Sequence, residues 1–292
     1  MIDPGLQDRV VLVTGANNPY GIGTATARAF AAQGARIFLH YYRVPTSRAD
    51  DSTPATEPGE AFYRAQSATG PEAVLRDIRE RGGVAEAWEI DLADPEAASA
   101  LLDRAESVLG PVEVLVNNAA HWEADTFVPA QSEPVNRAVE MWTDAPDPLT
   151  AGSMDRLYAV NVRAAVLLMS EFARRHAARG ATWGRIINIS TDGARCFPSE
   201  VSYGAGKLAM EGYTRSAAAE LGQFGITVNA VAPGPVQTGW ITPELERAIL
   251  PNVPMGRIGQ PEDIADAIVL LASQQAGWIT GQRIYVGGGH AM

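Results

Sequence analysis

The stretch RVVLVTGANNPYGIG, residues 9–23, joins a short apolar β-rich run to a glycine-rich turn and the start of a helix. Gly15, Gly21 and Gly23 would let the backbone turn tightly and approach a pyrophosphate, whose charge is stabilised at the helix N-terminus. A glycine-rich turn alone is weak evidence, because turns need glycine for other reasons. Its place directly after an N-terminal buried strand makes this stretch a good signal for dinucleotide binding.

The same alternation of short β-rich runs and helical stretches continues along the chain. Further strands are expected at 36–41, 85–91, 112–118, 185–190, 226–234 and 283–289, and helical stretches include 24–34, 94–110, 154–176 and 206–225. Continuous apolar strands between amphipathic helices indicate a parallel sheet covered on both faces. We therefore expect one α/β domain over residues 1–292, a doubly wound Rossmann-type sheet in a three-layer α/β/α arrangement. Such a sheet binds ligands beyond the carboxyl ends of its strands.

Two segments interrupt this rhythm. Residues 44–70 are polar and rich in Pro, Ser and Thr, which predicts a mobile surface loop. Residues 121–150 are more mixed and carry four large apolar side chains: Trp122, Phe127, Met141 and Trp142. This second insertion is either a lid over a pocket or a flap packed on the sheet edge, and the sequence leaves both open. Residues 239–257, with Trp240, are expected to form part of a substrate cover.

Composition limits the classes of partner. A net charge of −11 and a pI near 4.9 argue against nucleic acid or an anionic membrane as the main partner. We expect no signal peptide and no membrane span, and the single cysteine, Cys196, fits a reducing cytoplasm. The four histidines are scattered without ligand spacing, so no metal site is expected.

Lys207 is the only lysine among the 23 lysine and arginine residues, and it ends the stretch YGAGK, 203–207. An ammonium group is a compact point charge, whereas guanidinium is a broad planar fork. Tyr203 and Lys207 lie four residues apart in a predicted helix and so share one face. The ammonium would lower the pKa of the phenol and could donate to ribose hydroxyls. The alternative is an unremarkable pair on a solvent-exposed face.

Together these motifs resemble those of the short-chain dehydrogenase/reductase family, over nearly the whole chain apart from the two insertions. The matching segments are TGANNPYGIG (14–23), EIDLAD (89–94), NNAA (117–120), YGAGK (203–207) and PGPVQT (233–238). The glycine-rich turn is two residues longer than the usual T-G-x3-G-x-G, a length similar to that of the enoyl-carrier-protein reductases. Ala120 replaces the usual glycine of N-N-A-G. The last third of the chain looks most like the 3-oxoacyl-carrier-protein reductases.

The resemblance implies a nicotinamide dinucleotide cofactor, with Asp91 at the adenine ring and Thr238 at the carboxamide. The residues expected to contact it are Thr14, Gly15, Asn17, Gly21, Ile22, Gly23, Arg43, Asp91, Leu92, Asn118, Ala119, Lys207, Pro233, Gly234, Val236 and Thr238. Members that prefer NAD end the second strand with a carboxylate, but this position falls near Tyr41 here. Arg43 could pair with a 2′-phosphate, which favours NADP(H) over NAD(H). Otherwise Arg43 is a solvated loop charge.

The resemblance also implies the catalytic residues Tyr203, Lys207, Ser190 and Asn161. A hydroxyl that orients the substrate is expected about 13 residues before the tyrosine, which selects Ser190, whereas counting along the strand from Gly184 selects Thr191. We choose Ser190 and keep Thr191 as the alternative. Asn161 matches the asparagine that holds a water in the proton relay of the family.

The implied activity is hydride transfer between nicotinamide and a carbonyl carbon, with Tyr203 as acid and base. The substrate is expected to be a small carbonyl compound, and the resemblance to 3-oxoacyl-thioester reductases leaves a carrier-bound acyl group as an option. The alternatives are an enoyl reductase, suggested by the longer turn, and a catalytically silent nucleotide sensor on the same fold. Relatives of this kind assemble as tetramers or dimers through their middle helices and last strand, so a homo-oligomer is expected.

Overall fold

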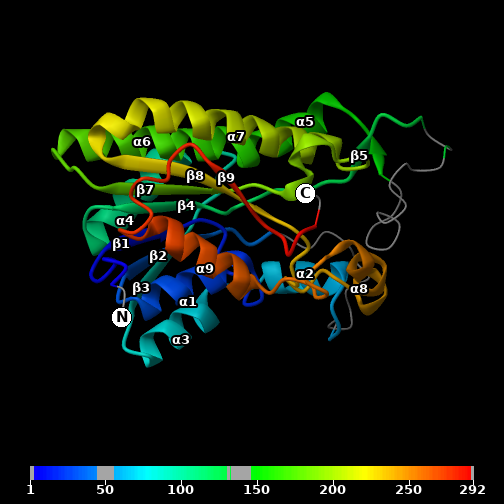
Figure 1. Ribbon diagram of the computed structural model, residues 1–292, viewed down its shortest axis with the longest axis horizontal. Coiled ribbons are helices and arrows are strands. Elements are labelled where there is room, and N and C mark those ends of the chain that lie inside the picture. The colour runs from blue at the N-terminus through cyan, green and yellow to red at the C-terminus, as the bar shows by residue number, and fades with distance from the viewer. Residues whose placement is uncertain (1–2, 45–55, 130–131, 133–145, 291–292) are drawn as a thin grey trace.

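Seven parallel strands form one sheet in the spatial order β3-β2-β1-β4-β7-β8-β9 (Figure 1). The structure is a computed structural model that describes residues 3–44, 56–129, 132 and 146–290. The strands are β1 (Val10–Val13), β2 (Arg36–Tyr41), β3 (Val84–Glu89), β4 (Val114–Asn117), β7 (Gly184–Ile189), β8 (Ile226–Pro233) and β9 (Arg283–Val286). The chain leaves β1 in one direction and returns to β4 on its other side, so the strand order reverses between β1 and β4. Sheets of this kind bind ligands at that reversal.

The central strand β1 contributes side chains to both cores of the molecule. Val11 and Val13 belong to one buried cluster, and Val10 and Leu12 belong to the other. Successive side chains of a strand point to opposite faces, so an uninterrupted apolar run is what a sheet covered on both faces requires. This explains why the first strand contains no polar residue.

Helices cover both faces of the sheet, as Figure 1 shows. One face carries α1 (Ile22–Ala32), α3 (Glu72–Glu80) and α9 (Pro261–Ala272), and the other carries α4 (Ala97–Leu109), α6 (Ala165–Ala178) and α7 (Val201–Leu221). The remaining helices are α2 (Glu60–Ser67), α5 (Ala151–Tyr158) and α8 (Pro243–Ile249). The predicted three-layer, doubly wound α/β domain is therefore confirmed.

The first insertion differs from the mobile loop predicted for residues 44–70. Residues 45–55 lie outside the described residues, but Glu60–Ser67 form helix α2. The backbone N–H of Gly59 donates to the carbonyl of Gly239 at 2.9 Å, and the ring of Tyr63 packs against Trp240 with centroids 4.9 Å apart. The overall polarity of the insertion concealed these contacts, because its Pro, Ser and Thr residues lie mainly before residue 58 while its aromatic residues come later.

The described ends of the second insertion lie near the start of α7. Strand β5 (Asp125–Thr126) pairs in parallel with β6 (Asp147–Pro148), and the side chain of Asp125 accepts a hydrogen bond from Ser202 N–H at 2.9 Å. Met141 and Trp142 lie outside the described residues. The choice between a lid and a flap stays a prediction for that part of the insertion.

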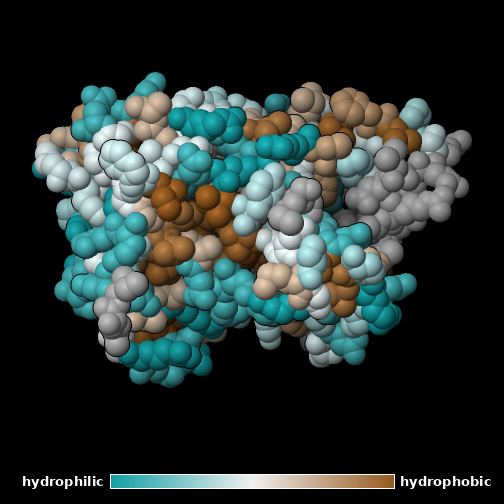
Figure 2. Space-filling view, viewed as in Figure 1, coloured by the Kyte–Doolittle hydropathy of each residue, from teal (hydrophilic) through white to brown (hydrophobic). Residues whose placement is uncertain are grey.

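Apolar side chains reach the surface near the last strand of the sheet. Leu270, Ile279 and Tyr285 are all exposed to a third or more, and Trp278 is fully exposed. Figure 2 shows hydrophobic residues gathered over β9 and α9. The expected association of copies through the last strand stays a prediction. Within the part of the chain that the structure describes, no helix combines the length and hydropathy needed to cross a membrane.

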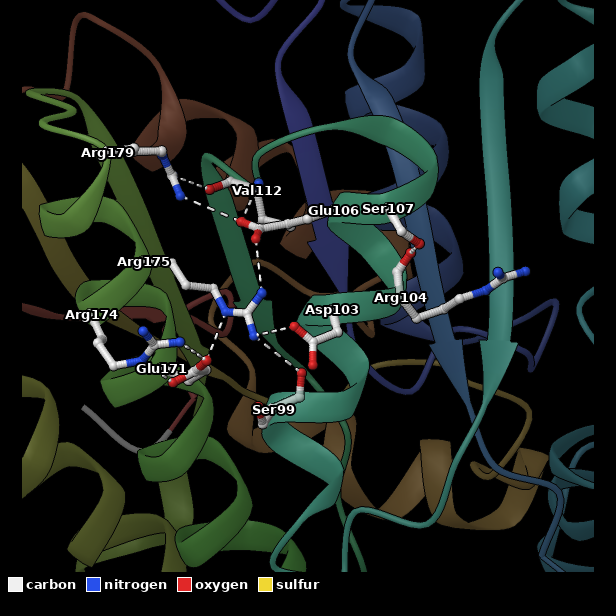
Figure 3. Close-up of polar contacts among 10 residues, drawn as sticks. All are labelled: Ser99, Asp103, Arg104, Glu106, Ser107, Val112, Glu171, Arg174, Arg175 and Arg179. Carbon is white, nitrogen blue, oxygen red and sulfur yellow. Dashed lines mark hydrogen bonds and ion pairs between the residues drawn. The ribbon is translucent and has the colours of Figure 1, made fainter.

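An ion-pair network joins α4 to α6 on one outer layer (Figure 3). The guanidinium of Arg175 lies 2.6 Å from a carboxylate oxygen of Asp103, 2.9 Å from Glu106 and 2.7 Å from Glu171. Its side chain is only 13% exposed, so these charges attract one another through little solvent. The network therefore fastens two helices that otherwise meet through apolar side chains.

Replacing Arg175 by Met should destabilise the fold by roughly 2 kcal/mol, because its guanidinium pairs with three carboxylates at once. Glu171 keeps Arg174 and Glu106 keeps Arg179 at 3.4 Å, whereas Asp103 loses its ion pair. Urea unfolding with fitted midpoint and slope measures this loss. Arg174→Met is the matched control: Arg174 is 64% exposed and pairs with Glu171 alone, so its loss should stay below about 1 kcal/mol. Equal, small losses in the two variants would show that the network is not stabilising.

Candidate active site

Two glycines of the turn after β1 are required by close backbone contacts. Gly15 has φ of +67°, and a Cβ there would lie 2.7 Å from the Cα of Ala119. A Cβ on Gly23 would lie 2.4 Å from the carbonyl oxygen of Gly15. Any larger residue at either position would push the turn away from the end of β4.

Side-chain hydrogen bonds join the ends of β1 and β4 behind this turn. The hydroxyl of Thr14 accepts from the backbone N–H groups of Asn118 and Ala119, both at 3.0 Å. The amide of Asn118 donates to the carbonyls of Thr14 at 2.9 Å and Gly15 at 2.8 Å. Thr14 is 1% exposed, so its part in a nucleotide site is to hold the turn in place.

His40, on β2, supports the turn and was missed by the sequence analysis. Its Nδ1 accepts a hydrogen bond from Gly15 N–H at 3.2 Å, and its Nε2 lies 2.9 Å from the carbonyl of Ile90. Burial lowers the pKa of His40 to about 4, so the ring is neutral and Nε2 carries the proton. The only sequence signal was a histidine inside an otherwise apolar strand.

The remaining residues predicted to contact a dinucleotide lie at the start of α1, after β3 and at the end of β8. Helix α1, all of which the structure describes, follows Gly21 with no side-chain cap and no acidic residue in its first turn, so Ile22 begins a helix end suited to phosphate. The exposed Asp91 accepts from Ala93 N–H at 2.8 Å and precedes the buried Leu92. Four further predicted contacts lie at or just beyond the carboxyl end of β8: Pro233, Gly234, Val236 and Thr238.

The side chain of Asn17 has a structural role besides its predicted contact with the cofactor, which stays a prediction. Its amide nitrogen donates to the carbonyls of Ser67 at 2.7 Å and Thr69 at 2.8 Å. The side chain therefore binds the end of α2 to the glycine-rich turn. This contact joins residues about fifty positions apart, so local sequence gave no indication of it.

Arg43 is not a free loop charge. Its guanidinium forms an ion pair with Glu89, with Nε 2.9 Å from one carboxylate oxygen, although the Arg43 side chain remains 56% exposed. Glu89 ends β3 and pairs in register with Tyr41, so a carboxylate does stand at this edge of the sheet. A carboxylate was expected only at the end of the second strand, whereas Glu89 lies on the third. Hydrogen bonds from Arg43 hold the pKa of Glu89 below its usual range.

Tyr203 and Lys207 lie on α7 at the carboxyl end of β7. Lys207 is 2% exposed, and its Nζ donates to the carbonyl of Ile189 at 2.8 Å. The same Nζ lies 5.6 Å from the centroid of the Tyr203 ring. Burial lowers the pKa of Lys207 to about 8. A planar guanidinium would not fit this enclosed position as the compact ammonium does.

The expected effect of Lys207 on the acidity of Tyr203 is not found. Burial raises the pKa of Tyr203 well above its ordinary value of 10, and the charges of Glu200, Tyr63 and Asp192 raise it further. Desolvation penalises a phenolate, and here it outweighs the attraction of one ammonium. Tyr203 is therefore a neutral phenol that holds its proton at physiological pH.

Ser190 is also placed differently from its predicted role. Its hydroxyl is buried and donates to a carboxylate oxygen of Glu211 at 2.5 Å, and Glu211 in turn pairs with Arg283 at 3.0 Å. Thr191 follows it, and consecutive residues at a strand end point to opposite sides. Thr191 is half-buried, and its hydroxyl makes only long hydrogen bonds: it accepts from the N–H of Gly193 at 3.4 Å and donates to a carboxylate oxygen of Asp192 at 3.5 Å. Because the Ser190 hydroxyl is already bonded inside the fold, we now expect Thr191, the alternative, to orient the substrate.

Asn161 lies where the helix between α5 and α6 widens into a π-helical segment, Ala159–Ala164. Its amide accepts from the N–H of His121 and donates to the carbonyl of His121, both at 2.8 Å. These bonds satisfy a buried amide and anchor the chain leaving β4. Its role in holding a water stays a prediction.

Aromatic rings gather near Tyr203, two of them from the insertions. Trp240 packs edge-on against Tyr63 at 4.9 Å and against Trp122 at 5.0 Å between centroids. The indole N–H of Trp122 donates to the carboxylate of Glu200 at 2.6 Å. Tyr63 and Glu200 were not predicted as site residues, because neither belongs to a motif and both depend on contacts distant in sequence.

Comparison with known proteins agrees with this geometry. The family model described as enoyl-(acyl carrier protein) reductase matches residues 55–291. The chain is 37% identical over 284 residues to an uncharacterized oxidoreductase, YjdA, of Bacillus subtilis, with 97% of each chain covered. It is 32% identical over 291 residues to 3-oxoacyl-[acyl-carrier-protein] reductase FabG of Pseudomonas aeruginosa, covering 98% of this chain and 99% of the relative.

Solved structures of similar fold include members of the same family. A short-chain dehydrogenase/reductase from Serratia marcescens matches with a TM-score of 0.76 at 30% identity, covering 98% of this chain and 99% of that one. A blue fluorescent protein from a metagenomic library, in complex with NADPH, matches with a TM-score of 0.74 at 29% identity and the same coverage. The chain belongs to the short-chain dehydrogenase/reductase family and is an oxidoreductase.

Two variants separate the neighbouring hydroxyls. Thr191→Val should lower turnover on the order of a hundredfold while stability stays near wild type, because it removes the hydroxyl that we expect to donate to a developing oxyanion. Ser190→Ala should leave turnover within about threefold but cost roughly 1–3 kcal/mol of stability, because Glu211 loses a buried partner. Steady-state rates and urea unfolding measure both. The reverse pattern would restore Ser190 to the catalytic role.

Proposed function

We propose that this oxidoreductase reduces a carbonyl group to an alcohol with NADP(H). The observation that carries the proposal is the pairing of Tyr203 with the buried Lys207 ammonium at the end of β7. Tyrosine is a general acid when it holds its proton, and burial keeps the Tyr203 phenol protonated. A phenol in that state can donate the proton that reduction of a carbonyl requires.

Each residue of the site has a stated role. The bound nicotinamide supplies the hydride. Tyr203 gives its proton to the carbonyl oxygen, and the Thr191 hydroxyl donates a hydrogen bond to the same oxygen as charge develops there. Lys207 holds a positive charge beside Tyr203 and has donors left for a ribose hydroxyl. Asn161 fixes the backbone at His121 and supports water-mediated return of a proton to Tyr203.

The finer assignments have separate support. A 3-oxoacyl thioester substrate is supported by the relatives named as 3-oxoacyl-carrier-protein reductases. NADP(H) is supported by the exposed guanidinium of Arg43 at the edge of β2 and by the structural neighbour in complex with NADPH. The enoyl-reductase alternative is supported by the description of the matching family model.

The central test follows NADPH oxidation with a panel of ketones, a β-ketoacyl thioester and its enoyl counterpart. Tyr203→Phe should lower turnover by about a thousandfold with nucleotide binding retained. Lys207→Arg should also cripple turnover although it keeps the charge. The wild-type rate should fall as pH rises through about 8, because Lys207 then loses its proton.

Tyr213→Phe is the matched control, because Tyr213 lies on the same helix but is 41% exposed. Near wild-type rates in Lys207→Arg would disprove the argument from a compact charge. Turnover of the enoyl thioester alone would identify an enoyl reductase, and tight NADPH binding without turnover across the panel would identify a nucleotide sensor.

The coenzyme preference has its own test. Arg43→Gln should weaken NADPH binding roughly 10- to 100-fold, the value of a charge-assisted hydrogen bond to phosphate, and leave NADH binding unchanged. Titration of each coenzyme against protein fluorescence measures both constants. Arg81→Gln, which removes a more exposed arginine whose guanidinium pairs with Asp77, should change neither. Equal loss for NADPH and NADH would contradict a 2′-phosphate contact.

A further inference from the structure

Glu200 is a buried carboxyl group that the mechanism leaves unused. It is 4% exposed, stands immediately before α7, and precedes Tyr203 by three residues. Its charge is among the causes that raise the pKa of Tyr203, so the two groups are close. Glu200 is therefore positioned beside the site where a substrate carbonyl would bind.

The charge of Glu200 lacks a cation among the residues that the structure describes. Its hydrogen bond comes from a neutral group, the indole N–H of Trp122 at 2.6 Å. Burial raises the pKa of Glu200 to about 7, and the charge of Asp125 adds to the effect. An uncompensated buried carboxylate is costly, and such groups cluster at functional sites.

A second buried carboxyl makes the excess of negative charge larger. Asp125 is 1% exposed, and one of its oxygens accepts the N–H of Ser202. The other oxygen, Oδ2, is buried without a hydrogen-bond partner in the described part of the chain. Two acidic groups therefore stand together, and neither forms an ion pair with any residue that the structure describes.

Aromatic rings border the same carboxylate. Trp122 donates to Glu200 and packs against Trp240, which in turn packs against Tyr63. Ring faces attract ammonium groups electrostatically, most strongly in the case of tryptophan and where water is excluded. A carboxylate with neighbouring indoles is the chemistry that recognises an organic cation.

We propose that the substrate carries an ammonium group a few bonds from its carbonyl, and that Glu200 binds this group with Trp122 and Trp240 beside it. The inference rests on the proposed carbonyl reductase activity and narrows its substrate class to amino ketones. It also favours a small, free substrate over a carrier-bound acyl chain, which would bring no positive charge to Glu200.

The test compares two ketones of the same shape that differ in charge: trimethyl(2-oxopropyl)ammonium and its neutral carbon analogue 4,4-dimethyl-2-pentanone. Wild type should show kcat/KM about 30-fold higher for the cation, the scale of a desolvated cation–aromatic and carboxylate contact. Glu200→Gln keeps an acceptor for the Trp122 indole but removes the charge. It should abolish the preference, so that the two ketones react with similar kcat/KM.

Glu123→Gln is the matched control, because the carboxylate of Glu123 already has a cation, Arg156, at 2.6 Å. It should leave the preference unchanged. No preference in the wild type, or an equal loss for both ketones in Glu200→Gln, would overturn the inference and leave Glu200 as an anchor for Trp122.

Binding of the ammonium ketone, followed by tryptophan fluorescence, separates this inference from the proposed function. Tighter binding to wild type than to Glu200→Gln, without reduction of any carbonyl, would reject the reductase activity yet support the cation site. Reduction of neutral ketones with equal cation binding by both proteins would reject the cation site alone.

Discussion

The hydrogen bond from the Lys207 ammonium to the carbonyl of Ile189 ties helix α7 to the end of β7, and the chemical half of the site depends on it. It fixes the helix that carries Tyr203 against the strand that leads to Thr191. An ammonium buried this deeply is expensive unless its donors are used, so the position tolerates little change. The rarity of lysine in this chain is consistent with a requirement at this one place that arginine cannot meet.

The two halves of the site have different structural origins. The nucleotide side is built from the ends of β1 and β4, where Thr14, Asn118 and His40 hold the glycine-rich turn. The substrate side is built largely from additions to that frame: α2 and the segment that follows β4. Helix α2 bonds to the turn through Asn17 and to the substrate loop through Gly239, so it connects the two halves. Specificity can therefore change through the additions while the nucleotide frame is preserved.

The fold was predictable because its signals are local: apolar runs of strand length, helical periodicity and a glycine-rich turn in the right order. The positions of Tyr203 and Lys207 were predictable for the same reason. The orienting hydroxyl was not, since Ser190 and Thr191 differ by one residue in spacing, and our preference for Thr191 rests on the contact between Ser190 and Glu211, which no motif reports. The direction of the Tyr203 pKa shift depends on burial, which no motif reports. Glu200, His40 and Tyr63 acquire their roles from partners that are remote in the chain or lie outside the motifs, and sequence patterns do not contain that information.

Arg283 gives the last strand a part in the site, because its guanidinium donates to the carbonyl of Thr191 at 2.9 Å across 92 residues. In a chain that folds from its N-terminus during synthesis this contact forms late, because Arg283 lies on the last strand of the sheet. A chain emerging from the ribosome can therefore build the nucleotide frame from β1 to β4 well before its substrate-orienting turn is fixed. We therefore expect the chain to bind the coenzyme before it can catalyse the reaction, because catalysis requires the final strand.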